Sequence, residues 1–155
     1  MTLVDLKRMV ISALDKFICN EEYLLSNDVS ERTISSQVAN YLTAESDNFR
    51  DFRWSIDCEY NRHLDFPKQL IINNEHVRVI PDIIIHVRGE NNYGNFSDNN
   101  LLVIEIKKNA SVDNREYDLL KINGFIDQEP YNYKYGLFIN FVDTNYELEW
   151  LIRQN

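Results

Sequence analysis

The chain has 155 residues and a mass of 18.4 kDa, the size of one domain in which helices cover a sheet. Hydrophobic residues make up 44% and aromatic residues 12% of it, which argues against a largely disordered chain. With 25 acidic and 16 basic residues, the formal net charge is −9. Long-range repulsion therefore argues against a processive or tight DNA-binding protein, although salt screens that repulsion beyond roughly 8 Å.

The two cysteines, Cys19 and Cys58, have no CxxC or CxxH spacing, so neither a zinc site nor a disulfide framework is indicated. Reduced thiols are typical of a cytoplasmic protein. Charged residues such as Asp5 and Lys7 interrupt the N-terminal segment, so we expect neither a signal peptide nor a membrane span. The sequence predicts a single soluble domain over residues 1–155, located in the cytoplasm.

Apolar residues at intervals of three and four predict an amphipathic helix over residues 2–20, with Thr2 as its cap. We expect this helix to pack on the rest of the domain; the alternative is a dimer face. A second helix is predicted from about Val29 to Leu42, after the polar turn at residues 26–28.

Glu31 in the second helix has two interpretations. It lies three residues after Asp28, as in a capping box. It also shares a helical stripe with Ile34, Val38 and Leu42, which would face the core. The residues alone leave both interpretations open.

The segment from Phe52 to Arg62 alternates apolar and polar residues, which predicts a strand with one polar face. Asp57 and Glu59 lie on the polar face and could join a metal site. A solvated face, or pairing with Arg53 and Arg62, is the favoured interpretation.

The next segments read as a connection, a strand, a loop and a strand. Residues 63–76 are predicted to form an irregular connection or a wide hairpin. The runs Val77 to Val87 and Leu101 to Ile106 are rich in Ile and Val and predict two strands. The polar loop between them, residues 88–100, is either a mobile lip of a substrate cleft or a surface turn.

Each of these two strands carries a carboxylate: Asp82 lies in the first and Glu105 in the second. An acidic group in a largely buried strand costs several kcal/mol unless it is paired or binds a cation. Lys107 follows Glu105 by two residues, so both side chains leave the same face of the strand. His86 shares a face with Asp82 and could reach a phosphate, although a lone strand histidine is more often structural.

A third helix is predicted with Asp113 as its cap and Glu116 at the capping-box position. Arg115 and Lys121 could project toward a phosphate backbone, or could form salt bridges with Asp118 and Glu116. Its apolar side is expected to consist of Tyr117, Leu119, Leu120, Ile122, Phe125 and Ile126. Two more strands follow: a buried one from Tyr133 to Val142 and an edge strand from Tyr146 to Arg153, joined by a turn at residues 143–145.

Pro81 and Asp82, with Glu105, Ile106 and Lys107 on the next predicted strand, resemble the signature of the PD-(D/E)XK nuclease superfamily, also called the restriction-endonuclease-like fold. The context supports the resemblance, because both halves of the motif lie on consecutive predicted strands with a helix before and a helix after. The resemblance implies an α+β fold with an α-β-β-β-α-β core. Its mixed central sheet would be flanked by helices, with the first helix of the chain as an addition.

By this resemblance, Asp82 and Glu105 would bind Mg²⁺ or Mn²⁺, with the backbone carbonyl of Ile106 as a third ligand. Lys107 would stabilise charge in the transition state rather than act as a base, because neighbouring carboxylates raise its pKa. Many members take a further acidic residue from the first core helix, which would be Glu31. The alternative is a buried salt bridge between Lys107 and Asp82 or Glu105 that only satisfies the sheet.

Three functions are compatible with the sequence. The first is a metal-dependent nuclease that hydrolyses phosphodiester bonds, of DNA rather than RNA, and acts as a homodimer or in a larger complex. The second is a catalytically inactive protein of the same fold that serves as an acidic protein-interaction module, as the net charge of −9 favours. The third is an unrelated α+β small-molecule binder that carries the motif by chance. No membrane partner is expected.

Overall fold

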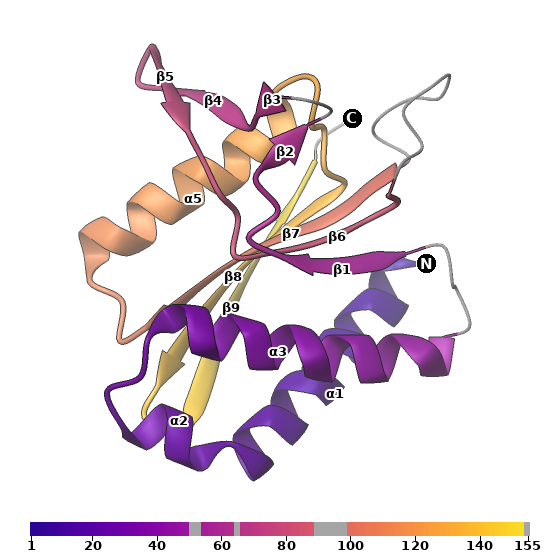
Figure 1. Ribbon diagram of the computed structural model, residues 1–155, viewed down its shortest axis with the longest axis vertical. Helices are drawn as coiled ribbons and strands as arrows, with labels where there is room; N and C mark the ends of the chain where they lie inside the picture. The colour runs from indigo at the N-terminus through magenta and orange to yellow at the C-terminus, as the bar shows by residue number, and fades with distance from the viewer. Residues whose placement is uncertain (50–53, 64–65, 89–98, 154–155) are drawn as a thin grey trace.

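A mixed five-stranded sheet lies between helices on its two faces (Figure 1). The structure is a computed structural model that describes residues 1–49, 54–63, 66–88 and 99–153. The α-helices within these residues are α1 (Leu3–Asn20), α2 (Glu22–Ser26), α3 (Glu31–Ser46) and α5 (Val112–Asp127), and a short 3-10 helix follows at Asp47–Phe49. The strands of the sheet, in spatial order, are β1 (Ser55–Cys58), β6 (Ile83–His86), β7 (Asn100–Lys108), β8 (Tyr135–Val142) and β9 (Asn145–Ile152).

The order of the elements confirms the predicted fold class. Apart from two small hairpins between β1 and β6, the elements α3, β1, β6, β7, α5 and β8 follow one another as α-β-β-β-α-β. β1, β6 and β7 are antiparallel neighbours, and β8 runs parallel to β7 because α5 carries the chain back across the sheet. The two predicted C-terminal strands are also confirmed, with β9 antiparallel to β8 at the edge. The fold is mixed α+β, with α1 as the additional helix.

α1 forms where the apolar periodicity predicts it. The side chain of Thr2 accepts a hydrogen bond from the backbone N–H of Asp5 at 3.2 Å, which confirms the predicted cap. The buried face of α1 packs against α3 and the sheet, as expected for a packing role. It contributes Leu6, Met9, Val10, Ala13, Leu14 and Phe17 to the core.

The predicted caps of the other two long helices are wrong. Ser30, not Asp28, caps α3, and its hydroxyl accepts from the N–H of Thr33 at 3.3 Å. Ser111, not Asp113, caps α5. Serine and aspartate are about equally good caps, so the sequence did not fix which acceptor begins the helix. The capping-box interpretation of Glu31 falls with this correction.

α5 buries a narrower apolar side than expected. Ile122, Phe125 and Ile126 are buried, and Leu119 is partly buried against them. Tyr117 and Leu120, in contrast, are 45% exposed. The helix covers the sheet with one stripe, and charged residues occupy the neighbouring positions.

The predicted strand from Val77 to Val87 is two strands in different sheets. Its first residues belong to β5 (Glu75–Arg78), and the chain then breaks before β6. Pro81 has no N–H for a sheet ladder, which accounts for a break at this point. Asp82 therefore lies just before the first residue of β6 and not within a strand.

The connection at residues 63–76 contains two hairpins. β2 (Arg62–His63) pairs with β3 (Phe66–Pro67), and β4 (Gln69–Ile72) pairs with β5. Asn73 and Asn74 join β4 to β5 with φ angles of 52° and 65°, the left-handed conformation that asparagine tolerates in tight turns. The side-chain amide of Gln128, after α5, donates to the carbonyl of Ile71 and accepts from its N–H, each at 2.8 Å. These bonds fasten the β4–β5 hairpin to the end of α5.

β1 is shorter than the strand predicted from Phe52 to Arg62. It ends where Glu59 takes a φ of 48° and donates its N–H to the carbonyl of Asp82 at 3.0 Å. The first part of the predicted strand lies outside the described residues, together with Arg53 and with residues 89–98 of the predicted loop.

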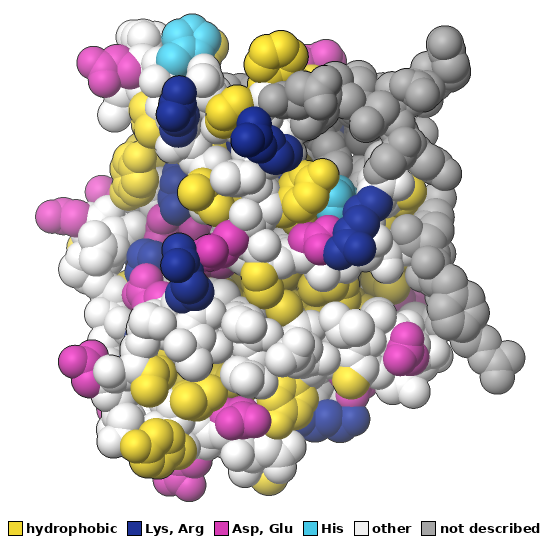
Figure 2. Space-filling view, in the orientation of Figure 1, with side chains coloured by type: hydrophobic (Ala, Val, Ile, Leu, Met, Phe, Trp, Pro, Cys, Tyr) yellow, Lys and Arg dark blue, Asp and Glu magenta, His cyan; other side chains and the backbone are white. Residues whose placement is uncertain are grey.

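The two faces of the sheet bury different side chains. Alternate residues of the strands point toward α1 and α3, where they form a continuous apolar cluster. The other residues point toward α5 and form a smaller apolar cluster that polar and charged groups interrupt. Figure 2 shows charged side chains of both signs across the middle of the molecule.

α5 approaches the sheet closely at one glycine. A Cβ atom added to Gly136 of β8 would lie 2.1 Å from Cγ2 of Ile122 on α5, well inside contact distance. No helix in the described part of the chain is long and apolar enough to cross a membrane.

Candidate active site

Asp82 and Glu105 lie opposite each other on the α5 side of the sheet. β6 and β7 pair Ile83 with Ile104, so the antiparallel register places the preceding residue, Asp82, across from Glu105. The backbone N–H of Ile106 donates to Oδ2 of Asp82 at 2.7 Å and fixes that carboxylate. These two residues were predicted to lie on adjacent strands, and the structure brings them together.

Glu105 is buried, and Asp82 is partly buried. Glu105 is 1% exposed, and burial raises the pKa of its carboxyl to about 8, although Lys121 opposes the shift. Burial also raises the pKa of Asp82, partly offset by the hydrogen bond from Ile106 and by the charge of Lys107. Two neighbouring carboxyl groups that have lost part of their hydration are stabilised in their ionised forms by a nearby cation.

Lys121 of α5 provides one such cation. Its Nζ lies 2.7 Å from Oε2 of Glu105 and 2.7 Å from Oδ1 of Asp118. Burial alone would lower the pKa of Lys121, but the two carboxylates outweigh burial and raise it. The expected salt bridge between Lys121 and Asp118 is confirmed, and the contact with Glu105 is an addition.

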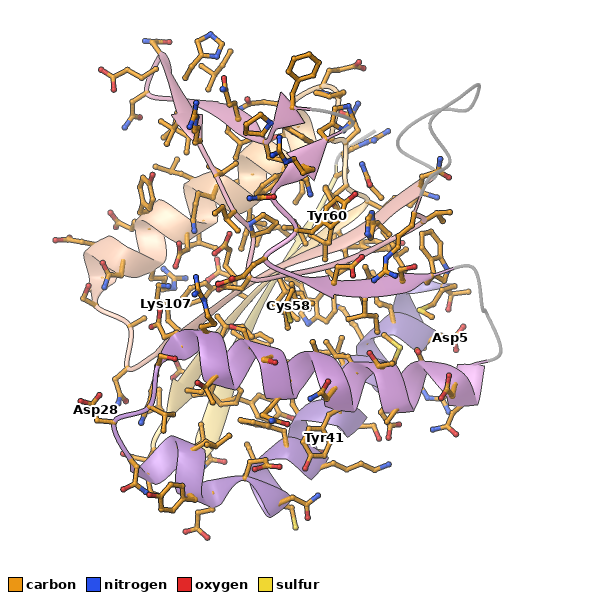
Figure 3. All side chains as sticks on the ribbon, in the orientation of Figure 1. Asp5, Asp28, Tyr41, Cys58, Tyr60 and Lys107 are labelled. Carbon is orange, nitrogen blue, oxygen red and sulfur yellow. The ribbon has the colours of Figure 1, made fainter. Side chains whose placement is uncertain are left out.

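Lys107 bridges three elements at the end of β7. Its Nζ lies 2.9 Å from Oε2 of Glu31 on α3, 3.4 Å from Oδ2 of Asp118 on α5, and 3.3 Å from the carbonyl oxygen of Ile106. Figure 3 shows Lys107 in the space between α3 and α5. Burial would lower the pKa of Lys107, but Glu31 and Asp118 outweigh burial and raise it.

These contacts show that the predicted alternative, a salt bridge between Lys107 and Asp82 or Glu105, is wrong. Lys107 pairs with Glu31 and Asp118, and not with Asp82 or Glu105. The carboxylate of Glu31, 42% exposed, reaches the site, as the resemblance implied. Asp118 is a site residue that the sequence pattern does not reveal, because its spacing of three from Lys121 indicates only a salt bridge along the helix.

An open cleft adjoins this site. It has a volume of about 530 Å³ and is lined by Glu31, Lys108 and residues of the α2–α3 and β8–β9 connections. Glu31 also accepts a hydrogen bond from the N–H of Lys108 at 3.4 Å, so one carboxylate joins the cleft to Lys107. The cleft gives a polar ligand access to the end of β7.

Other residues that the sequence suggested for a site lie outside the group formed by Asp82, Glu105 and Lys107 with their partners. Glu59 pairs with Arg32 at 2.6 Å, and Arg115 pairs with Glu149 rather than with a residue of its own helix. Asp57 contacts His86 and Arg88 and belongs to a separate group of charges.

The donor set fits a hard divalent cation only in part. Oε1 of Glu105 is buried and has no hydrogen-bond partner, and Asp82 supplies a second carboxylate across the ladder. Within residues 1–49, 54–63, 66–88 and 99–153, however, no group of three or more His, Cys, Asp or Glu side chains could hold a metal ion. The fit therefore needs the carbonyl of Ile106 as well, and all three donors would be oxygens, as Mg²⁺ and Mn²⁺ prefer.

Comparisons with protein-family models, with curated proteins and with solved structures found no match. The geometry of the site is the ground on which a function can be argued.

Proposed function

We propose that the protein is a metal-dependent nuclease that hydrolyses phosphodiester bonds and belongs to the PD-(D/E)XK superfamily. The observation that carries the proposal is the pair Asp82 and Glu105, which lie opposite each other: Asp82 is partly buried, Glu105 is buried, and one oxygen of Glu105 has no hydrogen-bond partner among the described residues. A buried, unpartnered carboxylate oxygen is costly, and a bound divalent cation would remove that cost.

Asp82, Glu105 and the carbonyl of Ile106 would hold Mg²⁺ or Mn²⁺. When bound, the ion activates water and neutralises charge on the phosphate. Asp82 is already oriented by the N–H of Ile106, so little reorganisation is needed on its side.

Lys107 would stabilise the negative charge that develops on the phosphate. Its raised pKa keeps it protonated at neutral pH, which suits charge stabilisation and not proton abstraction. Glu31 and Asp118 hold the ammonium from two helices, so they are positioning residues for Lys107.

The substrate is proposed to be nucleic acid, DNA rather than RNA, and a homodimer or a larger complex would cut both strands of a duplex. A cytoplasmic location is also proposed. It is supported by the two cysteines, Cys19 and Cys58, which are free thiols.

A second candidate function is a non-catalytic, acidic protein-interaction module of the same fold. Two observations favour it. Lys121 already supplies a cation to Glu105 at 2.7 Å, and the net charge of the chain is −9. In that case the ion pairs are structural, and no metal binds.

Titration calorimetry with Mg²⁺ and Mn²⁺ separates the two candidates. The wild type should bind one of these ions and cleave mixed DNA or RNA substrates, and Asp82→Asn should lose both properties. The matched control is Glu45→Gln, which removes a buried carboxylate paired with Lys16 far from the site. A wild type that binds neither ion and cleaves nothing would contradict the nuclease and favour the interaction module.

A further inference from the structure

A second group of charges lies on the α5 side of the sheet, at the end of β6 away from Asp82. Its centre is Asp57 of β1, whose Oδ2 lies 2.7 Å from Nε2 of His86 and accepts from Nε of Arg88 at 2.8 Å. Arg88 donates a further hydrogen bond to Oδ1. Lys68 is near enough for the charge of Asp57 to act on it. We call Asp57, Lys68, His86 and Arg88 the Asp57 cluster.

Lys68 is the unusual member. It is 3% exposed, and its Nζ lies 3.5 Å from the hydroxyl of Tyr133 and 5.0 Å from the ring centre of Tyr60. Among the described residues, no carboxylate lies within ion-pairing distance of Nζ. Burial lowers the pKa of Lys68 to about 7. A buried amine with this environment is stabilised as a cation when an anion comes near.

The Asp57 cluster contains more basic than acidic residues, whereas the chain as a whole has a negative net charge. Lys68, His86 and Arg88 are three basic groups around one carboxylate, in a chain whose net charge is −9. Figure 2 shows a histidine, an acidic and a basic side chain together on this face. Because burial lowers the pKa of His86, the positive charge of the cluster at neutral pH comes from Arg88 and from the protonated fraction of Lys68.

The guanidinium of Arg88 can bind a second anion in addition to Asp57. Its side chain is 61% exposed, and Asp57 engages only Nε and one terminal nitrogen of the guanidinium. Among the described residues Nη1 has no hydrogen-bond acceptor, so its donors can form hydrogen bonds with a phosphate. Tyr60, 37% exposed, lies 4.9 Å from the ring of His86 and offers an aromatic surface beside this position.

The distance from the candidate active site suits a polymer. His86 lies four residues after Asp82 along β6, which corresponds to about 13 Å at the rise of a strand. The rise of 3.4 Å per nucleotide is measured along the duplex axis, and each strand also winds around that axis, so a strand covers this distance in fewer than about four nucleotides. Figure 3 shows Lys107 and Tyr60 on the same side of α3, with the ends of the strands between them.

We propose that the Asp57 cluster is a phosphate-binding subsite that holds the backbone of a nucleic acid a few nucleotides from the phosphate cleaved at Asp82 and Glu105. Arg88 contacts the phosphate, Lys68 supplies positive charge behind it, His86 holds Asp57 in place, and Tyr60 stacks on a base. The inference rests on the proposed function, and it adds the residues that hold the substrate away from the reacting bond.

Fluorescence anisotropy of labelled oligonucleotides in EDTA tests the subsite without cleavage. Arg88→Gln should weaken binding about tenfold at low salt and should reduce the slope of log affinity against log salt by about one. The matched control is Arg8→Gln, because Arg8 is also a surface arginine beside an aspartate, but on α1 at the opposite face of the sheet. Affinity and salt slope for Arg88→Gln equal to those of the wild type would overturn the proposal.

A second variant guards against a folding effect. Lys68→Met replaces the lysine with an apolar side chain of similar length; it removes the charge, the cation–π contacts with Tyr60 and Tyr133, and the hydrogen bond to the hydroxyl of Tyr133. The variant should bind oligonucleotides more weakly than the wild type while its melting temperature is retained or raised. Wild-type affinity in both Lys68→Met and Arg88→Gln would again overturn the subsite.

Two further experiments distinguish a failure of the subsite proposal from a failure of the proposed function. If inorganic phosphate binds the wild type and not Arg88→Gln, while both bind oligonucleotides equally, the cluster takes a free anion and the nucleic-acid assignment is wrong. Mg²⁺ titration of Arg88→Gln should match the wild type. Loss of metal binding in the wild type itself would contradict the proposed function and leave the anisotropy result to decide the subsite.

Discussion

The two faces of the central sheet differ in what they bury, although the same strands build both. Toward α1 and α3, β6 and β7 present Ile83, Ile85, Ile104 and Ile106, all buried within one apolar cluster. Toward α5, the alternate positions of the same segment include charged groups such as Glu105. Because neighbouring side chains of a strand leave opposite faces, a dry core on one side can support ionisable groups on the other.

The difference indicates that one face of the sheet provides stability and the other carries the candidate functional groups. The cluster beneath α1 and α3 supplies the burial of apolar surface that stabilises the domain. Among the described residues, the α5 side holds buried charges that cost free energy: Lys68, which has no carboxylate within ion-pairing distance, and Glu105, which has one oxygen without a hydrogen-bond partner. Costly groups of this kind are often found at functional sites.

The largest change in stability is expected on the apolar face. Phe141→Ala removes a fully buried ring that lies 5.2 Å from the ring of Phe17, and it should lower the free energy of unfolding by about 3–5 kcal/mol. Urea unfolding measures this change. A loss below about 1 kcal/mol would mean that the apolar face does not dominate stability.

A smaller effect, of opposite sign, is expected on the α5 side. The folded state holds Lys68 with a pKa of about 7, against an ordinary value of 10.5, so the unfolded chain binds more protons between these values. The penalty for burying Lys68 is complete below pH 7 and falls as the pH rises toward 10.5. Lys68→Met should therefore be more stable than the wild type at pH 7, and this advantage should shrink by about 2 kcal/mol at pH 9.

Unfolding curves of the two proteins at pH 7 and pH 9 check this prediction. His63 and His86 also lie near Lys68, and burial lowers the pKa of each, so their titration falls below this window. Lys16→Met, on the opposite face, serves as the control for loss of a lysine charge. An advantage of Lys68→Met that grows with pH would refute the assignment.

The smallest effect concerns the hairpin on the α5 side. Gln128→Ala removes both hydrogen bonds to the backbone of Ile71 and should lower stability by about 1 kcal/mol. Hydrogen exchange should show faster exchange confined to β4 and β5, with the amides of β7 and β8 unchanged. Uniformly faster exchange would instead make the hairpin part of the global folding unit.

Features with a strong period could be predicted from the sequence. The apolar stripe of residues 2–20 located α1, and the apolar runs located β7 and β8. Pro81 has no N–H for a sheet ladder and so indicates the break before β6, but the continuous apolar run across it predicts one strand. Helix starts were missed where two acceptors competed, as with Asp28 and Ser30.

The pairing of charges could not be predicted in the same way. Asp82 and Glu105 are placed by a register between adjacent strands, which the alternation of residues nearly determines. The partners of Lys107 come from α3 and α5, and only the packing of helices on the sheet brings Glu31 and Asp118 together. Local patterns contain no information on such contacts.

The close approach at Gly136 makes the electrostatics of the candidate site depend on an uncharged position. Lys121 and Asp118 reach the sheet only while α5 stays at its present distance, and a methyl group at Gly136 would collide with Ile122 and press the helix outward. An outward step would lengthen the 2.7 Å contact between Lys121 and Glu105. The distance between α5 and the sheet thus controls this ion pair. A larger side chain at position 136 of β8 would therefore change the affinity of Glu105 for a cation, although position 136 carries no charge.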